Sequence, residues 1–278
     1  MRFCTTHLLR VYRSISIPAG LLALIITAGC GSPSNWTKQQ TAPSVAEVAS
    51  HVAAGASAPR VLLFVGTGTS SGSVAALKTI LGDLHLSYAT ANSSQLNGMS
   101  ASALAAYKML LVPGGDAVTI SKSLSSATVA KVHSAVNNGM HYLGICAGAF
   151  FAGHSGIYDY LDFTPTGVWF NFYADEFKGI HKEAVEIKGA DGSRLDQYWE
   201  NGPQLGGWGQ VVGKYPDGTP AIVEGKSGNG WVILCAVHPE ATQAWRGSMK
   251  FTTSVAADNN YAKTLVTNAF NGTSLPHF

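Results

Sequence analysis

Basic residues occur singly along this sequence and never in runs. The 278 residues include 18 Lys and Arg against 16 Asp and Glu, which leaves a formal net charge of only +2. Domains that bind nucleic acid usually concentrate Lys and Arg on one face, because many of their contacts are made to phosphates. We therefore do not expect nucleic acid as a partner.

Charged residues of both signs are scarce, and no segment of the sequence is repeated. Only 12% of the residues are charged, while 46% are apolar. This balance argues against intrinsic disorder of the whole chain and provides enough apolar side chains for one core of ordinary size.

Cysteine is scarce as well, with four residues at positions 4, 30, 146 and 235. The first two precede the expected folded domain, so only Cys146 and Cys235 remain inside it. Two cysteines provide no disulfide framework. Cys235 has the context of a small buried residue, whereas the residues around Cys146 indicate a function.

No apolar run near the N-terminus is long enough to cross a bilayer as a helix. Arg2, Arg10 and Arg13 precede the uncharged run Ile15–Ala28, which falls short of the roughly 20 residues that a spanning helix needs. A basic start followed by a short apolar run is typical of a secretory signal.

The end of this run resembles the lipobox of bacterial lipoproteins. It reads Thr27-Ala28-Gly29-Cys30, although leucine is commoner than threonine at the first of these positions. The resemblance implies a signal peptide over residues 1–29, lipid on Cys30, and a lipid-anchored place in the bacterial cell envelope, at the outer membrane or its periplasmic face. An ordinary cleaved signal and an uncleaved anchor are the alternatives.

Residues 30–59 are rich in Ser, Ala, Thr, Gln and Pro and contain almost no large apolar residues. Such a composition is typical of a flexible linker, because it offers little apolar surface to bury. We predict a tether over residues 30–59 and one folded domain over residues 60–278.

From Arg60 onward, short apolar runs alternate with amphipathic stretches. This pattern is typical of βα units around a mainly parallel sheet. The first half predicts strands at 61–65, 86–89, 108–112 and 141–145, and helices at 73–84 and 126–137. The second half predicts strands at 182–188, 210–212, 221–224 and 231–237, which form an antiparallel meander, and a closing helix at 259–270.

Cys146 stands between Gly144 and Gly148, where the predicted strand 141–145 meets a helix. We expect His154 on the same helix, as a surface or helix-end residue. This spacing is typical of a nucleophile elbow, in which the central residue has a strained backbone and its neighbours must lack bulk. The free amides at the start of the helix would favour a thiolate on Cys146. Tight packing of a strand against a helix is the simpler explanation for the small residues.

His238-Pro239-Glu240 follows the predicted strand 231–237. Residues two apart in an extended segment point the same way, so this imidazole and carboxylate would share one side of the chain. His238 is placed to take a proton from Cys146, and Glu240 to orient the ring. The triplet is a weak signal alone and a stronger one after the elbow.

The segments GICAGAF and VHPE resemble the GxCxG and HPE signatures of class I glutamine amidotransferase-like domains. More narrowly, the sequence resembles the N-terminal domain of biotin-protein ligase. That likeness rests on the Gly/Ser-rich loop Gly66–Ser71, the Pro-Gly-Gly turn Pro113–Gly115 and the loop Asn201–Pro203, and it covers roughly residues 60–242.

The resemblance implies a flavodoxin-like three-layer α/β sandwich with Cys146, His238 and Glu240 as a catalytic triad. It also implies an oxyanion hole formed by the amide of Ala147 and one amide of Gly114-Gly115, although Pro-Gly-Gly serves equally well as a plain turn. At the pocket mouth we expect Trp199, Asn201 and Gly202.

Two departures leave the substrate open. Glutaminase domains carry a polar residue four positions after the nucleophile, where this sequence has Phe150, and neither a synthetase nor a ligase domain follows. One hypothesis is a cysteine hydrolase that acts on an amide or ester of a small molecule or peptide. The other is a non-catalytic, surface-tethered module that binds such a molecule. A purely structural envelope protein leaves the triad unexplained.

We expect neither a metal nor another cofactor. The histidines show no His-x-x-x-His pattern and the cysteines no Cys-x-x-Cys pattern, so a zinc site is not indicated. Gly66-Thr67-Gly68 follows a predicted strand, but the third glycine of a dinucleotide-binding loop is misplaced.

Overall fold

The computed structural model describes residues 60–173, 181–247 and 249–278. They belong to the compact unit Gly55–Phe278. The expected signal peptide, the tether and Cys30 lie outside the described residues.

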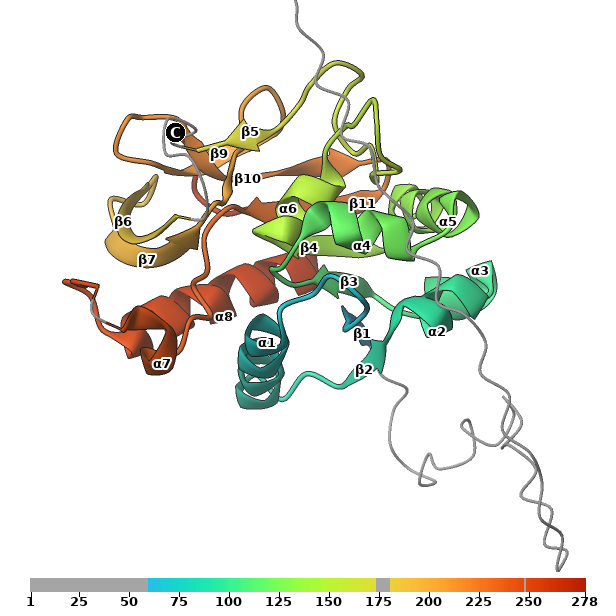
Figure 1. Ribbon diagram of the computed structural model, residues 1–278, viewed down its shortest axis with the longest axis horizontal. Helices are drawn as coiled ribbons and strands as arrows, with labels where there is room; N and C mark the ends of the chain where they lie inside the picture. The colour runs from blue at the N-terminus through green and yellow to red at the C-terminus, as the bar shows by residue number, and fades with distance from the viewer. Residues whose placement is uncertain (1–59, 174–180, 248) are drawn as a thin grey trace, which may run out of the picture. The chain divides into compact units, whose positions relative to one another are not determined.

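A mixed sheet forms the middle layer of this unit (Figure 1). From one edge to the other, its strands in the described part of the chain are β2 (Tyr88–Ala91), β1 (Val61–Phe64), β3 (Met109–Val112), β4 (His141–Ile145), β11 (Gly230–Cys235), β10 (Pro220–Ser227), β9 (Gln210–Lys214), β6 (Lys182–Gly189) and β7 (Arg194–Glu200). The strands from β2 to β11 are parallel, and every pairing from β11 to β7 is antiparallel. The predicted α/β fold with a parallel sheet and an added antiparallel part is confirmed.

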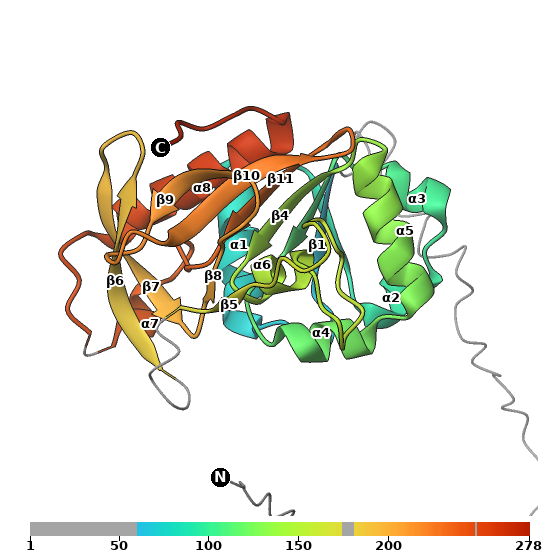
Figure 2. The same ribbon diagram turned by 90° about the horizontal axis from the view of Figure 1, so that it is seen from above.

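Helices cover both faces of the parallel half. They are α1 (Ser71–Asp83), α2 (Ser93–Gly98), α3 (Ala101–Ala105), α4 (Ala117–Ser123), α5 (Ser126–Asn137), α6 (Ala147–Ala152), α7 (Gln243–Arg246) and α8 (Val255–Asn271). Figure 1 shows α1 and α8 on one face and α4, α5 and α6 on the other. Figure 2 shows β6 and β7 at the opposite end of the molecule from α2, α3 and α5.

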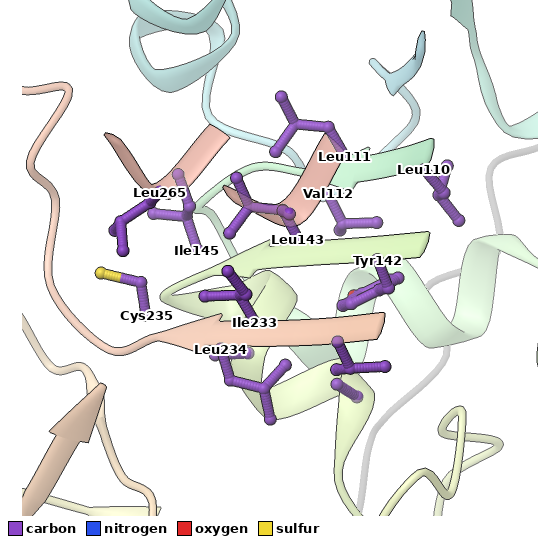
Figure 3. Packing of buried hydrophobic residues seen from close by; sticks show 14 of the residues in the cluster. Leu110, Leu111, Val112, Tyr142, Leu143, Ile145, Ile233, Leu234, Cys235 and Leu265 are labelled. Carbon is purple, nitrogen blue, oxygen red and sulfur yellow. The ribbon is translucent and has the colours of Figure 1, made fainter. Parts of the chain in front are cut away.

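Two strands of the parallel half of the sheet, β1 and β3, are continuous apolar runs. All four residues of β1 and of β3 are buried, as expected for strands covered by helices on both faces. In the register of β4 and β11, Ile145 is the partner of Cys235. Figure 3 shows both side chains in the core near Leu265 of α8. Cys235 is fully buried, and burial raises the pKa of its thiol.

The prediction was less complete where apolar periodicity is weak. It found α5 and β4 at their observed bounds, and placed the second strand two residues too early, since β2 is Tyr88–Ala91. It missed α2, α3, α4, α7, the short strands β5 (Asn171–Phe172) and β8 (Pro203–Gln204), and also β7. Strand β7 alternates poorly because four consecutive residues, 196–199, are all buried.

A fully buried carboxylate fastens the C-terminal segment to the sheet. Oε1 of Glu224, on β10, accepts hydrogen bonds from the Ser274 hydroxyl at 2.9 Å, the Leu275 amide at 2.7 Å and His277 Nε2 at 2.7 Å. A buried charge is costly unless such donors surround it. The segment after α8 is therefore part of the folded unit.

Within the described part of the chain, no helix has the length and apolar character needed to cross a bilayer.

We predict that Glu224→Ala lowers the free energy of unfolding by about 3 kcal/mol, because the Leu275 amide and His277 Nε2 lose their acceptor and the Ser274 hydroxyl keeps only the Leu275 carbonyl oxygen. Ser274→Ala removes one donor and should cost about 1 kcal/mol. Urea denaturation followed by circular dichroism measures both values. Equal losses in the two variants would show that Glu224 does not hold the segment together.

Candidate active site

Cys146 occupies a strained backbone conformation at the junction of β4 and α6. Its φ is 49° and its ψ is −102°, a combination that costs an ordinary residue about 1–3 kcal/mol. The two glycines that flank it at a spacing of two are required by close packing. A methyl group at position 148 would lie 2.2 Å from the Val112 carbonyl oxygen, and one at position 144 would lie 2.4 Å from the Gly148 carbonyl oxygen.

The helix after the elbow is shorter than the sequence indicated. It ends at Ala152, so His154 lies beyond it and not on it. Six residues supply a weaker dipole than a long helix does, since fewer aligned peptide units add to it. The local amides, and Ala147 above all, are therefore the main contribution of α6 to the site.

His238 and Glu240 meet as the sequence predicted, but through a turn and not through an extended segment. Strand β11 ends at Cys235, and the Ala241 amide donates to the His238 carbonyl oxygen at 3.1 Å. Nδ1 of His238 lies 2.9 Å from Oε1 of Glu240. The His238 amide donates to the Tyr198 carbonyl oxygen at 2.8 Å, so the unpredicted strand β7 helps to hold the imidazole.

The thiol of Cys146 lies beside the His238 side chain and contributes to the raised pKa of the ring. The thiol also lies 3.7 Å from the carbonyl oxygen of Glu200. Both Cys146 and His238 are only 4% exposed, and Glu240 is 1% exposed. The structure thus brings the thiol, the imidazole and the carboxylate of the predicted triad together in a largely dry environment.

The His238 pKa is raised well above its ordinary value. Burial alone would lower this pKa, but the negative charge of Glu240, the charge of Cys146 and the hydrogen bonds to both side chains together outweigh it. The protonated ring is therefore stabilised beside the thiol.

Ser73 is a member of this cluster that the sequence analysis missed. It lies in the first turn of α1, is fully buried, and donates its hydroxyl to Oε1 of Glu240 at 2.7 Å. The Gly114 amide in turn donates to the Ser73 hydroxyl oxygen at 3.1 Å. The Gly/Ser-rich loop before α1 was the available signal, although nothing in it distinguished Ser73 from its neighbours.

These bonds decide between the two glycines of the predicted oxyanion hole. The Gly114 amide already donates to the Ser73 hydroxyl oxygen, so Gly115 is the candidate of the two for the oxyanion hole. Gly114 instead packs against the imidazole, where a methyl group would lie 2.3 Å from Cε1 of His238. In the described part of the chain, no protein acceptor is recorded for the amides of Gly115 and Ala147, and both residues line the pocket.

A pocket of about 650 Å³ opens beside the thiol. It is lined by residues from four parts of the domain: the turn Gly115–Val118 with Ser70, the elbow with Phe150, the segment 154–172, and the group Glu200, Asn201, His238 and Trp245. Cys146 is one of the lining residues. The nucleophile candidate is therefore accessible from a cavity large enough for a small molecule.

Two of the residues expected at the pocket mouth are not there. Trp199 is 2% exposed and donates its indole N–H to the Gly202 carbonyl oxygen at 3.3 Å, inside the core. Gly202 packs against the Ala236 carbonyl oxygen, 2.0 Å from where a methyl group would be. Side chains alternate along β7, so Glu200 faces the pocket while Trp199 faces away. Asn201 does line the pocket.

His154, which we expected at the surface or a helix end, also lines the pocket. Its Nδ1 lies 3.0 Å from Oδ1 of Asp162, and its ring meets that of Trp169 edge to face at 4.9 Å. The segment from 154 to 172 has no strong periodicity, so its position over the pocket was invisible in the sequence.

Among residues 60–173, 181–247 and 249–278, no three His, Cys, Asp or Glu side chains gather as metal ligands would.

Comparisons with known proteins agree with this architecture. Residues 59–163 match the family model described as biotin-protein ligase, N terminal. Over 149 residues the chain is 28% identical to the pyridoxal 5'-phosphate synthase subunit PdxT of Dehalococcoides mccartyi, a match that covers 49% of this chain and 72% of that protein.

Solved structures give the same fold. A glutamine amidotransferase from Thermotoga maritima superposes with a TM-score of 0.50 at 9% identity, covering 77% of this chain and 99% of the other. A candidate GMP synthase component from Thermoplasma acidophilum also has a TM-score of 0.50, at 12% identity, covering 76% and 94%. The domain thus has the class I glutamine amidotransferase-like fold, with the biotin-protein ligase N-terminal family match over its first half.

We predict that His238 stays protonated well above pH 6.5 in the wild type and loses its proton at a lower pH in Glu240→Gln, because burial then acts with less opposition. The raised folded pKa fixes the sign of the linked stability. The stabilisation is complete below about pH 6.5, where the unfolded ring is also protonated, and is lost as the pH rises through the folded pKa.

NMR titration of the ring C–H signals measures the first effect, and denaturation at pH 6 and pH 9 measures the second. Glu183→Gln is a matched control, because it removes a carboxylate 3.0 Å from a different ring, that of His181. A wild-type His238 that titrates at or below pH 6.5 would contradict the prediction.

Proposed function

We propose that this protein is an exported, lipid-anchored cysteine hydrolase that cleaves an amide or ester. One observation carries the proposal. A thiol on a strained elbow lies beside an imidazole that is paired with a buried carboxylate, and the thiol lines a cavity. Close packing explains the two glycines that flank Cys146. It does not explain why an imidazole with a raised pKa, that of His238, lies beside the thiol.

The geometry supports a two-step reaction. The Cys146 thiolate attacks the substrate carbonyl carbon, and the free amides of Gly115 and Ala147 are placed to stabilise the resulting oxyanion. His238 then gives its proton to the departing nitrogen or oxygen, the bond to that atom breaks, and a thioester remains on the sulfur. Water attacks the thioester with His238 as base, which releases the acid and restores the thiol.

Glu240 holds the imidazole in the orientation that this sequence of steps requires. Its Oε1 accepts from both His238 Nδ1 and the Ser73 hydroxyl. Because Ser73 is itself fixed by the Gly114 amide, the carboxylate has little freedom to rotate. Ser73 is a positioning residue, since it acts on the reaction only through Glu240.

Export and lipidation are supported by the sequence of residues 1–30, in which a basic start and a short apolar run lead to Cys30. In this proposal the lipid on Cys30 attaches the protein to a membrane of the bacterial cell envelope, and residues 31–59 hold the domain away from it. Because disulfides form readily outside the cytoplasm, a free and functional thiol there is well placed at a largely buried site.

We predict that a panel of cysteine-reactive acyl and epoxide probes labels the wild-type protein at Cys146. Labelling should be absent in Cys146→Ser and at least tenfold slower at pH 7 in His238→Ala, because that variant lacks the protonated imidazole that stabilises the thiolate. Intact-protein mass spectrometry measures the rates. Cys235→Ser is the matched control and should label at the wild-type rate, since Cys235 is fully buried.

A rate that is unchanged in His238→Ala would identify an ordinary thiol and contradict the hydrolase. A protein that binds small amides in the pocket without labelling would be the non-catalytic binding module.

We also predict that the protein takes up a fatty-acid analogue when produced in a bacterium that processes lipoproteins. Cys30→Ser should abolish the uptake and leave the protein in a soluble envelope fraction, because the acylated sulfur and amine belong to that residue. In-gel fluorescence after click labelling measures this. Cys4→Ser is the control and should not change it; uptake that persists in Cys30→Ser would refute the lipid site.

A further inference from the structure

Aromatic rings form much of the wall of the pocket beside Cys146. They belong to Phe150, Tyr158, Tyr160, Trp169, Phe170, Phe172 and Trp245. Phe150 packs against Phe172 with ring centroids 4.9 Å apart, and Tyr158 stacks on Tyr160 at 6.1 Å. Ring faces carry negative electrostatic potential, so a wall of this kind attracts cations as well as apolar groups.

Two carboxylates, those of Asp116 and Glu200, line the pocket, and none of its described lining residues is Lys or Arg. Each of the two lining histidines has a carboxylate beside it: Nδ1 of His154 lies 3.0 Å from Oδ1 of Asp162, and Nδ1 of His238 lies 2.9 Å from Oε1 of Glu240. Asp116 is the N-cap of helix α4 and is exposed. The pKa of Tyr160, another lining residue, is raised to about 12, first by burial and then by the negative charge of Asp116.

The triad does not offset this charge. The positive charge of a protonated His238 is balanced by the carboxylate of Glu240, 2.9 Å away, so the triad adds no net positive charge to the pocket. Two lysines that are not lining residues contact residues of the wall. Lys182 Nζ is 3.8 Å from Oε1 of Glu200, and Lys122 Nζ is 5.5 Å from the Tyr158 ring centroid. Lys182 is 56% exposed, so water screens much of its effect.

We propose that the part of the ligand bound in this pocket, away from the reacting carbonyl, carries a positive charge: an ammonium, quaternary ammonium or guanidinium group held between the aromatic rings and the carboxylates of Asp116 and Glu200. That this ligand is a substrate rests on the proposed hydrolase function. That it binds in the pocket does not depend on that function. A ligand with a carboxylate at the same place, as in the side chain of a dicarboxylic acid monoamide, is disfavoured by the same charges.

The test compares three amides of similar size that differ in charge. They are 4-(trimethylammonio)butanamide, its neutral isostere 5,5-dimethylhexanamide, and the anion of glutaric acid monoamide. Binding is measured by calorimetry on the full-length Cys146→Ser protein, which lacks the nucleophile. Because a cation over aromatic rings gains roughly two- to thirty-fold in affinity, we expect the cation to bind about tenfold more tightly than the neutral amide, and the anion to bind least.

Two substitutions then test whether the carboxylates of Asp116 and Glu200 cause the preference for the cation. Asp116→Asn and Glu200→Gln should each reduce the ratio of cation to neutral affinity about threefold. Asn is also a good helix N-cap, so Asp116→Asn preserves the start of α4. Asp83→Asn is the control, because it removes a surface carboxylate paired with Lys263, outside the pocket lining. It should leave the ratio unchanged.

A ratio of one or less overturns the inference, as does a ratio that both pocket substitutions leave intact. The outcome is separable from that of the labelling experiment. Cation preference without labelling of Cys146 would keep the binding site and reject the hydrolase. Labelling without cation preference would keep the hydrolase and reject this ligand class.

Discussion

The close crossing of β4, α6 and the end of β3 is the constraint on which the site depends. The chain turns at Cys146 with a backbone that ordinary residues avoid, and it does so against Val112, where only a glycine at position 148 fits. This crossing directs the thiol out of the middle of the sheet and places the Ala147 amide beside it. The turn that follows β3 then lies next to the same sulfur and supplies Gly115.

Two buried carboxylates organise the domain in similar ways. Glu224 gathers three donors from the C-terminal segment, and Glu240 gathers His238 and Ser73 from distant parts of the chain. In each case several short hydrogen bonds offset the cost of burying a charge. Only Glu240 has a titratable partner, His238, that lies beside a thiol. The buried carboxylate of Glu224 therefore holds a chain segment in place, whereas that of Glu240 also raises the pKa of the imidazole.

The likeness to the glutamine amidotransferase of known structure is a likeness of fold. The first half of the chain provides the parallel strands, the elbow and the turn Pro113–Gly115. The second half provides β7, whose end places Glu200 at the pocket, and the segment 154–172 brings aromatic rings over it. Both halves of the chain therefore contribute to the candidate triad and to the wall of the pocket.

The sequence by itself determined where the central strands β1, β3 and β4 lie along the chain, because burial on both faces demands continuous apolar runs. It also identified Cys146, His238 and Glu240, whose spacing reflects local backbone geometry. Only the tertiary structure decided which glycine amide is free, that Ser73 supports Glu240, that Trp199 is buried, and that His154 and Asp116 face the pocket. Those outcomes depend on contacts between residues far apart in the chain, and no local pattern records such contacts.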